Sequence, residues 1–426
     1  MTQPICTPSR SSLLSGTWPH QNGCLDNAGL LPERLECFPQ LLGDSDYRTG
    51  YYGKWHLGHE FQPQRGFDEW LSIIDGKWMK TGVTQGSFAM SDYAKFLVAQ
   101  GMEPKYDQKE PFSKHFISRL PLELSRVKFL ETKAADFLQR HQHDRFVLFV
   151  AFYEPHPPYN GPLNNEHPLA HVDLAPTFGK IFGDDMPDRY RQRQVVQAKT
   201  IAGNAEAYRK IKQHYLGLVT EVDRSIGTVL TKLDQLGLAE NTVVVHTSDH
   251  GEMMGAHGLF EKSVMYEEAL HVPYLLRLPG QNRAQRIASP VSHIDLVPTL
   301  LDLLGAPAHE QPVGRSRAAL LQNPAEQTAE TIFAQWNGRD NVFRKSGLTP
   351  TNETALREST RAAISADGWK LCLRDLDKKE LYNMRDDPRE EHNLYSDPRH
   401  SDVVARFTRE IHEWQERTND SLALQA

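Results

Sequence analysis

The sequence predicts an α/β fold, in which a large mixed and mostly parallel sheet is sandwiched by helices and followed by a small antiparallel sheet with a helix. Residues 146–152 are apolar throughout and lie between charged residues and Pro155, as expected of a buried central strand. Apolar side chains recur at helical spacing over residues 215–233, which predicts an amphipathic helix packed on that sheet. After about residue 310, short alternating runs indicate antiparallel strands.

A helix should begin directly after residue 6, because small polar residues there precede Leu13 and Leu14. Further along the chain, expected strands and helices alternate, as they do when a sheet is covered on both faces. The expected strands span residues 47–52, 146–152, 242–247 and 272–278. The expected helices span residues 215–233 and 294–304, and Gly237 and Gly305 follow them as suitable helix ends.

Two structural regions are expected. Residues 1–310 form the large domain, and residues 311–426 form a C-terminal subdomain with its own small sheet. The strands of that sheet lie near residues 331–336, 361–365 and 370–373, and a final helix covers about 403–416. Residues 155–205 are rich in Pro, Asn, His and Arg, which predicts long loops over the ligand-binding face.

Composition excludes several classes of partner. Lys+Arg total 48 against 55 for Asp+Glu, and the net charge of −7 gives no global attraction to nucleic acid. No run approaches the roughly 18 apolar residues of a membrane span. The four cysteines lack the paired spacing of a zinc site and are too few for a disulfide scaffold. These counts leave oligomeric state and cellular location open.

Four short motifs carry candidate chemistry. They are Cys6-Thr7-Pro8-Ser9-Arg10, Gly53-Lys54-Trp55-His56-Leu57-Gly58, Glu154-Pro155-His156-Pro157, and Ser248-Asp249-His250-Gly251-Glu252 with Lys262 beyond it. The last two follow expected strands, so their side chains should lie at the carboxyl edge of the sheet, where open α/β sheets bind ligands. The helix expected after residue 6 would present N–H groups that favour an anion.

Together these motifs resemble the signature of the type I, formylglycine-dependent sulfatases of the alkaline phosphatase-like superfamily. A further match over residues 379–394 extends the resemblance from residue 2 to about 415. The resemblance implies a sulfuric ester hydrolase acting on a sulfated small molecule or saccharide. It also implies that a separate maturation enzyme oxidises Cys6 to formylglycine (3-oxoalanine), whose hydrate attacks sulfur with one hydroxyl and expels sulfate through the other.

The resemblance assigns roles to individual residues. The implied catalytic residues are Cys6, Arg10, Lys54, His56, His156 and Lys262. By resemblance, Lys54 binds a sulfate oxygen and the nucleophile, and His56 is the base that helps to break down the sulfated intermediate. His156 contacts the sulfate ester and protonates the leaving oxygen, while Lys262 is a second cation against sulfate.

Calcium is the implied cofactor, with Cys6, Asp249 and His250 as ligands. In the family, a preceding strand ends in an Asp-Asp pair that supplies two more ligands, and residues 1–5 hold no such pair. We therefore expect Met1 to be an internal methionine, part of the central sheet to be missing, and calcium to bind weakly. The family implies a periplasmic or secreted location, with any signal peptide lost along with that segment.

Two other functions stay open. Relatives with formylglycine also hydrolyse phosphonate esters or phosphate diesters, which makes such an activity the second enzymatic reading. A truncated remnant would instead bind sulfate through Lys54, His156 and Lys262 without turnover. A carbohydrate is preferred as substrate because tryptophans suit stacking on sugar rings, the candidates being Trp18, Trp78 and Trp336.

Overall fold

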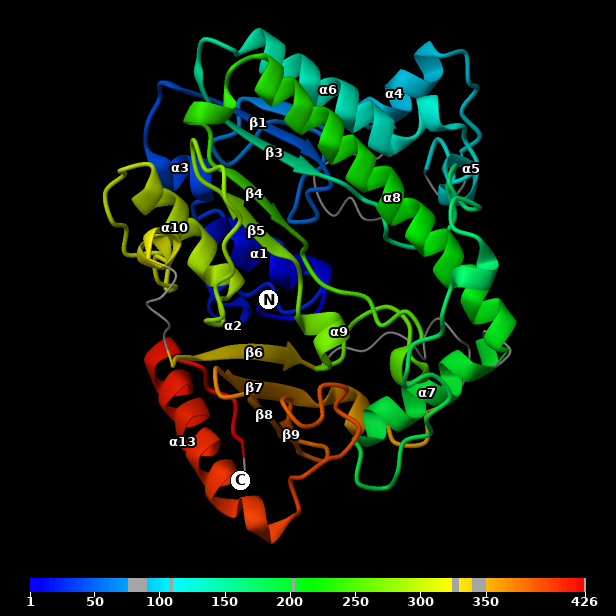
Figure 1. Cartoon of the computed structure of the whole chain (residues 1–426), viewed down its shortest axis with the longest axis vertical. Coiled ribbons are helices and arrows are strands. Elements are labelled where there is room, and N and C mark those ends of the chain that lie inside the picture. The colour runs from blue at the N-terminus through cyan, green and yellow to red at the C-terminus, as the bar shows by residue number, and fades with distance from the viewer. Residues whose placement is uncertain (76–89, 107–109, 201–203, 324–328, 339–349, 425–426) are drawn as a thin grey trace.

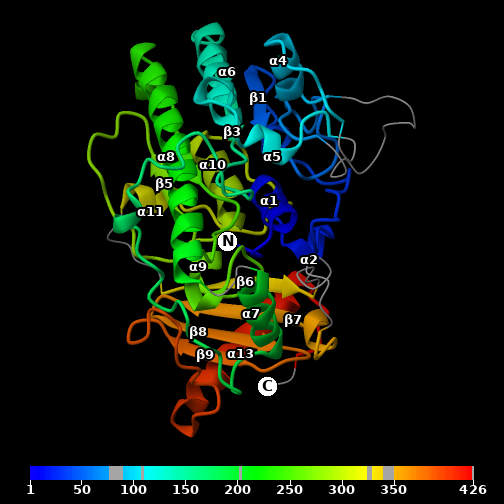
Figure 2. The same ribbon diagram turned by 90° about the vertical axis from the view of Figure 1, so that its right-hand side faces the viewer.

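The N-terminus lies in the middle of the molecule, between an upper and a lower part (Figures 1 and 2). The computed structural model describes residues 1–75, 90–106, 110–200, 204–323, 329–338 and 350–424. In Figure 1, sheets covered by helices form the upper part, and the C-terminal sheet with its helix lies below. Met1 lies between the two parts, where its ammonium donates to the Leu270 carbonyl at 3.3 Å and the Thr2 carbonyl accepts the Gln335 N–H.

Three parallel strands form the first sheet. In order across the sheet they are β2 (Glu69–Leu71), β1 (Tyr47–Gly53) and β3 (Arg145–Ala151). Helix α6 (Arg126–Arg140) packs on β1 and β3, and α8 (Ala205–Gln235) packs on α6. Side chains of α3 (Phe38–Leu42) and α10 (Leu296–Leu303) share a core with the first sheet through Val147 and Phe149 of β3.

The predicted α/β fold class is confirmed, and the second sheet corrects one detail of it, the position of the strand at 146–152. Strands β4 (Val244–Thr247) and β5 (Tyr274–Arg277) pair antiparallel and form a sheet of their own. Among the described residues the expected large sheet is therefore divided in two, and β3 is an edge strand in which only Val147 is buried. The prediction of a central strand at 146–152 is wrong on this point, because apolar composition predicts a strand but not its long-range neighbours.

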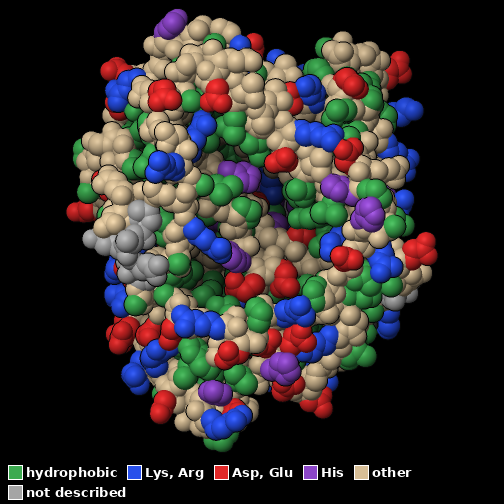
Figure 3. Space-filling model, viewed as in Figure 1, with side chains coloured by type: hydrophobic (Ala, Val, Ile, Leu, Met, Phe, Trp, Pro, Cys, Tyr) green, Lys and Arg blue, Asp and Glu red, His purple; other side chains and the backbone are tan. Residues whose placement is uncertain are grey.

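The face shown in Figure 3 is hollowed between α8 and the β4–β5 sheet. All four residues of β4 are half-buried, and Leu275 of β5 is 64% exposed. The hollow explains why these strands, although apolar in sequence, are not enclosed on both faces.

Helix α8 confirms the predicted helix at 215–233 and extends it toward the N-terminus. Its first turn is capped by Asn204, whose side-chain oxygen accepts the Glu206 N–H at 2.8 Å, and Gly237 follows the helix with a φ of 70°. Shorter helices complete this part: α1 (Cys6–Ser15), α2 (Pro19–Asn22), α4 (Asp92–Ala99), α5 (Lys114–Ile117), α9 (Glu267–Leu270) and α11 (Ala318–Gln322).

Helix α7 (Asp188–Thr200) lies within residues 155–205, where the composition predicts loops. Its first N–H groups are accepted by a distant carboxylate, since Asp377 accepts from Asp188 at 2.9 Å and from Arg189 at 3.0 Å. A cap supplied from so far along the chain leaves no local signal, which is why the sequence reading missed this helix.

The predicted small antiparallel sheet is present at the C-terminal end. Its strands, in order, are β6 (Thr331–Asn337), β7 (Ser359–Ser365), β8 (Trp369–Arg374) and β9 (Glu380–Asn383). Helix α13 (Ser401–Thr418) packs against β7 and β8. Residues 380–383, which begin the matched stretch at 379–394, form β9 and pair with β8 along their whole length.

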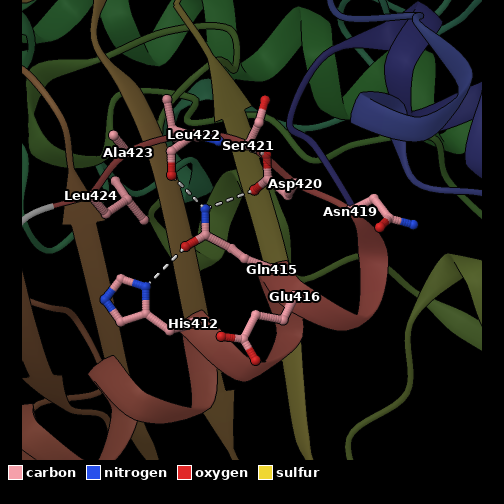
Figure 4. A pocket seen from close by; sticks show the side chains of 9 residues that line it. All are labelled: His412, Gln415, Glu416, Asn419, Asp420, Ser421, Leu422, Ala423 and Leu424. Atoms are coloured by element: carbon pink, nitrogen blue, oxygen red, sulfur yellow. Dashed lines mark hydrogen bonds between the residues drawn. The ribbon is translucent and has the colours of Figure 1, made fainter.

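The chain after α13 folds back against the end of that helix (Figure 4). Gln415 Nε2 donates to Asp420 Oδ2 at 3.1 Å and to the Leu422 carbonyl at 2.9 Å. Asp420 also forms a buried ion pair with Arg361 of β7. This pair joins the C-terminal segment to the sheet. Among the described helices, none has the length and apolar content needed to cross a membrane.

Candidate active site

Cys6 occupies the first position of α1 and is 1% exposed. The N-cap, Ile5, has an extended backbone and offers no side-chain cap, while the Thr7 N–H is accepted by Asn27 Oδ1 at 3.0 Å. The first N–H groups of a helix and its positive dipole end favour negative charge. The Cys6 side chain therefore lies where an anion is stabilised.

Lys54 and His56 reach position 6 from the end of β1. Gly53 has a φ of 124°, and a Cβ added there would lie 2.1 Å from a carbonyl oxygen of β3, so only glycine fits. Lys54 Nζ lies 3.3 Å from Asp249 Oδ2. The His56 imidazole hydrogen-bonds the Cys6 side chain. The tight end of β1 thus directs both functional side chains toward α1.

Asp249 and His250 approach from the other sheet, directly after β4. His250 Nε2 lies 3.2 Å from Cys6 Sγ, and His250 Nδ1 donates to the carbonyl of the next residue at 2.8 Å. Asp249 Oδ2 is 3.3 Å from both Arg10 Nη1 and Lys54 Nζ. One carboxylate therefore bridges two cations that come from separate elements.

His156 and Lys262 complete the group. His156 Nδ1 donates to the Pro157 carbonyl at 2.8 Å, its ring lies 4.6 Å from the Tyr153 ring, and it hydrogen-bonds Cys6. Lys262 is 7% exposed, and its charge acts on the Cys6 thiol. The structure thus brings together all the residues that the sequence selected: Cys6, Arg10, Lys54, His56, His156, Asp249, His250 and Lys262.

The protonation states of these side chains follow from burial and from the local positive charge. Burial by itself raises the pKa of the Cys6 thiol, but Lys54, His250 and Lys262 hold that pKa well below its ordinary value. Burial lowers the pKa of His156 to about 3, and the charge of Lys262 adds to this effect. Burial opposes ionisation of Asp249, yet neighbouring cations, Lys54 first, lower its pKa. The site is therefore positive, with an ionised carboxylate and a neutral His156, and it can stabilise an oxyanion beside a nucleophile.

Three of these residues also offer ligand atoms for a metal ion. Cys6 Sγ, a carboxylate oxygen of Asp249 and an imidazole nitrogen of His250 lie within 4.8 Å of one another. A carboxylate and an imidazole are accepted by divalent cations, and an oxygen at position 6 would add a third ligand. The set fits one side of a calcium site, because it supplies three of the about six to eight ligands that calcium takes.

Several supporting residues were missed by the sequence reading. Glu60 accepts the His56 N–H at 2.7 Å, Asn27 accepts a helix N–H as described above, and Ser9 Oγ lies 3.1 Å from Nδ1 of the buried His293. Ser9 belongs to the motif at residues 6–10, whereas Glu60, Asn27 and His293 belong to no recognisable motif. The sequence offered one signal, an acidic residue at position 60, four residues after His56.

Two of the three tryptophans proposed for sugar stacking are buried and cannot stack on a bound sugar. Trp18 and Trp336 are 3% and 2% exposed, and the Trp18 ring packs edge-on against Trp414 at 4.9 Å. Both are core residues, as large aromatic side chains commonly are. Trp78 lies outside the described residues.

His257 follows the Asp249-His250 motif in sequence but lies apart from the site. Its ring is fully buried and stacks against those of Tyr266, at 4.2 Å, and Phe182, at 5.7 Å. Burial, with the added charge of Lys180, lowers the pKa of His257 from 6.5 to about 4. Between these values the unfolded chain binds more protons than the folded chain, so the free energy of unfolding should fall as the pH drops, by on the order of 3 kcal/mol at the lower end.

Urea unfolding of the wild type and of His257→Gln between about pH 7 and pH 4 checks this expectation. The variant should lose much less stability than the wild type over this range. Equal losses in the two proteins would show that His257 does not titrate in the expected way.

Comparison with known proteins places this geometry in context. A family model described as sulfatase matches residues 1–306, and one described as the C-terminal region of N-sulphoglucosamine sulphohydrolase matches residues 255–417. The chain is 27% identical over 469 residues to an N-acetylglucosamine-6-O-sulfatase of Bacteroides thetaiotaomicron, a match that covers 97% of this chain and 78% of the relative.

Solved structures share the fold. A phosphonate monoester hydrolase from Silicibacter pomeroyi superposes with a TM-score of 0.77 at 21% identity, covering 98% of this chain and 87% of the other. A protein solved in complex with its substrate D-glucosamine-2-N,6-O-disulfate superposes with a TM-score of 0.71 at 22% identity, covering 99% and 90%.

Proposed function

Because this chain belongs to the sulfatase family, we propose that it hydrolyses a sulfate ester of a carbohydrate, with formylglycine made from Cys6 as nucleophile and Ca²⁺ as cofactor. The observation that carries the proposal is the convergence of Lys54, His250 and Lys262 on position 6, together with the carboxylate of Asp249. Positive groups fixed in a buried site stabilise an oxyanion as negative charge grows on it in the transition state.

Cys6 Sγ marks the place of the nucleophilic oxygen, since the hydrate of formylglycine would carry its hydroxyl groups where the thiol lies. That hydrate supplies one hydroxyl for attack on sulfur and a second for release of sulfate. A formylglycine-generating enzyme is accordingly a required partner. His56 lies beside position 6 and would accept and return the protons of these hydroxyl groups.

The remaining side chains bind the ester and its leaving oxygen. Lys54 and Lys262 would each contact a sulfate oxygen. The Nδ1 hydrogen bond of neutral His156 directs an unprotonated Nε2 toward position 6, a tautomer inferred from that hydrogen bond. A bound sulfate ester raises the pKa of His156 by its opposite charge, so the ring gains the proton that it passes to the leaving oxygen.

Asp249, His250 and the oxygen at position 6 would hold Ca²⁺, which supplies further positive charge against the sulfate oxygens. The relative that acts on N-acetylglucosamine-6-O-sulfate and the complex with a disulfated glucosamine support a sulfated amino sugar as the first substrate class to test. Sulfate release from a panel of defined sulfated saccharides, measured with formylglycine-bearing protein, is the test. Release from none of them, and from no aryl sulfate, would leave a sulfate-binding protein without turnover.

A phosphonate or phosphate diester hydrolase is the second candidate, favoured by the structural likeness to a phosphonate monoester hydrolase. The two substrates differ in the number of non-bridging oxygens that they present to the site. A sulfate ester presents three non-bridging oxygens, whereas a phosphonate monoester presents two and an organic group. That group would leave one buried ammonium, that of Lys54 or Lys262, without an anionic partner.

We therefore expect kcat/KM for an aryl sulfate to exceed that for the phosphonate ester of the same phenol by at least about 100-fold, or about 3 kcal/mol. The shared leaving group keeps leaving-group chemistry constant between the two substrates. Initial rates with both esters on one formylglycine-bearing preparation give the ratio. A ratio below one would make the phosphonate ester the better substrate and the second candidate the correct one.

A further inference from the structure

The backbone that carries Lys54 and His56 is held from one side by a single buried carboxylate. Glu60 Oε2 accepts the Trp55 N–H at 3.3 Å, and Glu60 Oε1 accepts the His56 N–H at 2.7 Å. Glu60 is 2% exposed, and its own carbonyl accepts the indole N–H of Trp70 at 2.6 Å. Burial means that water cannot readily replace these hydrogen bonds if the carboxylate is removed.

The backbone carbonyl groups of residues 54–56 accept hydrogen bonds from α1, the helix that carries Cys6. Arg10 donates to the Lys54 carbonyl and, through Nε, to the Trp55 carbonyl at 2.9 Å. Thr7 Oγ1 donates to the His56 carbonyl at 2.7 Å. The remaining group, the Lys54 N–H, is accepted by a carbonyl of β3 at 2.9 Å. Every backbone polar group of residues 54–56 therefore has a partner.

Lys54 and His56 depend on Glu60 to different degrees. Lys54 is fixed by β3, by Arg10 and by the ion pair of its ammonium with Asp249, none of which involves Glu60. His56 has a φ of 61°, a left-handed conformation that is unfavourable for a residue other than glycine, and its N–H is bound by Glu60. Without Glu60, the backbone at His56 would relax while Lys54 stayed in place.

We propose that Glu60 is a positioning residue that holds the His56 imidazole against the nucleophile at position 6. The inference rests on the proposed function, in which His56 moves protons at that position. Two N–H donors need two acceptor atoms, and the ionised carboxylate provides them. Burial raises the pKa of Glu60 to about 7, and the N–H groups of His56 and Trp55 oppose that rise by favouring the ionised form. A glutamine would provide one acceptor and turn an NH₂ donor toward the other N–H, so Glu60→Gln breaks the clamp with little change of volume.

Hydrogen exchange tests the clamp without any need for turnover. In Glu60→Gln, the amides of Trp55 and His56 should exchange at least about 10-fold faster than in the wild type, while those of β1 stay unchanged. Asp377→Asn is the matched control, because Asp377, in the C-terminal part, also accepts two consecutive N–H groups, those of Asp188 and Arg189 at the start of α7. Its effect on exchange should be confined to α7.

Turnover then tests the functional consequence. Glu60→Gln should lower kcat for an aryl sulfate by about 10- to 100-fold and change the Kd for inorganic sulfate by less than about threefold, because the base moves while Lys54 stays. Asp377→Asn should keep kcat within about twofold. In a His56→Ala background, Glu60→Gln should cost less than about threefold further, since a positioning residue has nothing left to position.

Unchanged exchange at Trp55 and His56 overturns the inference. So does faster exchange with an unaltered kcat, and so does an equal loss of kcat in the wild-type and His56→Ala backgrounds, which would indicate a general structural role. A wild-type protein that carries formylglycine but releases no sulfate overturns the proposed function instead, and exchange alone then decides whether the clamp exists.

Discussion

Replacing Cys6 by alanine is expected to lower kcat for an aryl sulfate by at least about 10⁴-fold, because the change removes the group from which the nucleophile is made. The surrounding cations would remain, so inorganic sulfate should still bind. Initial rates and sulfate binding on protein produced with a formylglycine-generating enzyme give the two quantities. Turnover within about 100-fold of the wild type would show that another residue attacks sulfur.

Cys37→Ala is the matched control for that experiment. Cys37 is also buried, and burial raises the pKa of its thiol to about 12, an effect that the charge of Arg65 offsets only in part. The contrast with Cys6, whose pKa is held low by three neighbouring cations, separates an inert core thiol from the functional one. The control should keep kcat per folded molecule within about twofold.

The second large effect is expected for Asp249→Asn. The change removes the partner shared by Arg10 and Lys54 and one candidate calcium ligand. Two buried cations without a counter-charge should destabilise the fold by about 3–5 kcal/mol, and displacement of Lys54 should lower kcat at least about 10³-fold. Urea unfolding and initial rates measure the two effects separately.

Asp420→Asn provides the comparison, since it breaks a buried ion pair with Arg361 in the C-terminal sheet. It should destabilise the fold to a similar degree while the folded fraction keeps its kcat. If Asp249→Asn behaves in the same way, with kcat of the folded molecules retained, then Asp249 serves stability alone and the assigned site is wrong.

Much of the fold could be predicted from periodicity and helix-end signals. The helix at 215–233, the strands at 47–52 and 242–247 and the antiparallel C-terminal sheet all have local patterns that identify them. The neighbours of each strand could not be predicted, because hydrophobicity indicates that a segment is a strand but not what pairs with it. Residues 146–152 show this most clearly, since an apolar strand lies at the edge of its sheet in the described structure.

Part of the candidate site could likewise be predicted from the sequence, and part could not. Side chains within motifs were identifiable, and the structure brings Cys6, Lys54, His156 and Asp249 together although they lie far apart in sequence. Glu60 was not identifiable, because its role consists of hydrogen bonds to backbone groups that the fold alone places beside it. The exposure of Trp18 and Trp336 was equally beyond reach, since composition cannot show which aromatic side chains are buried.

The central claim is that residue 6, once converted to formylglycine, makes this chain a sulfuric ester hydrolase. Its most direct test is sulfate release from an aryl sulfate by preparations with different degrees of conversion at residue 6, each quantified by mass spectrometry of the peptide containing that residue. We expect a rate proportional to the converted fraction, with a line through zero. A rate independent of that fraction, or no release at full conversion, would contradict it.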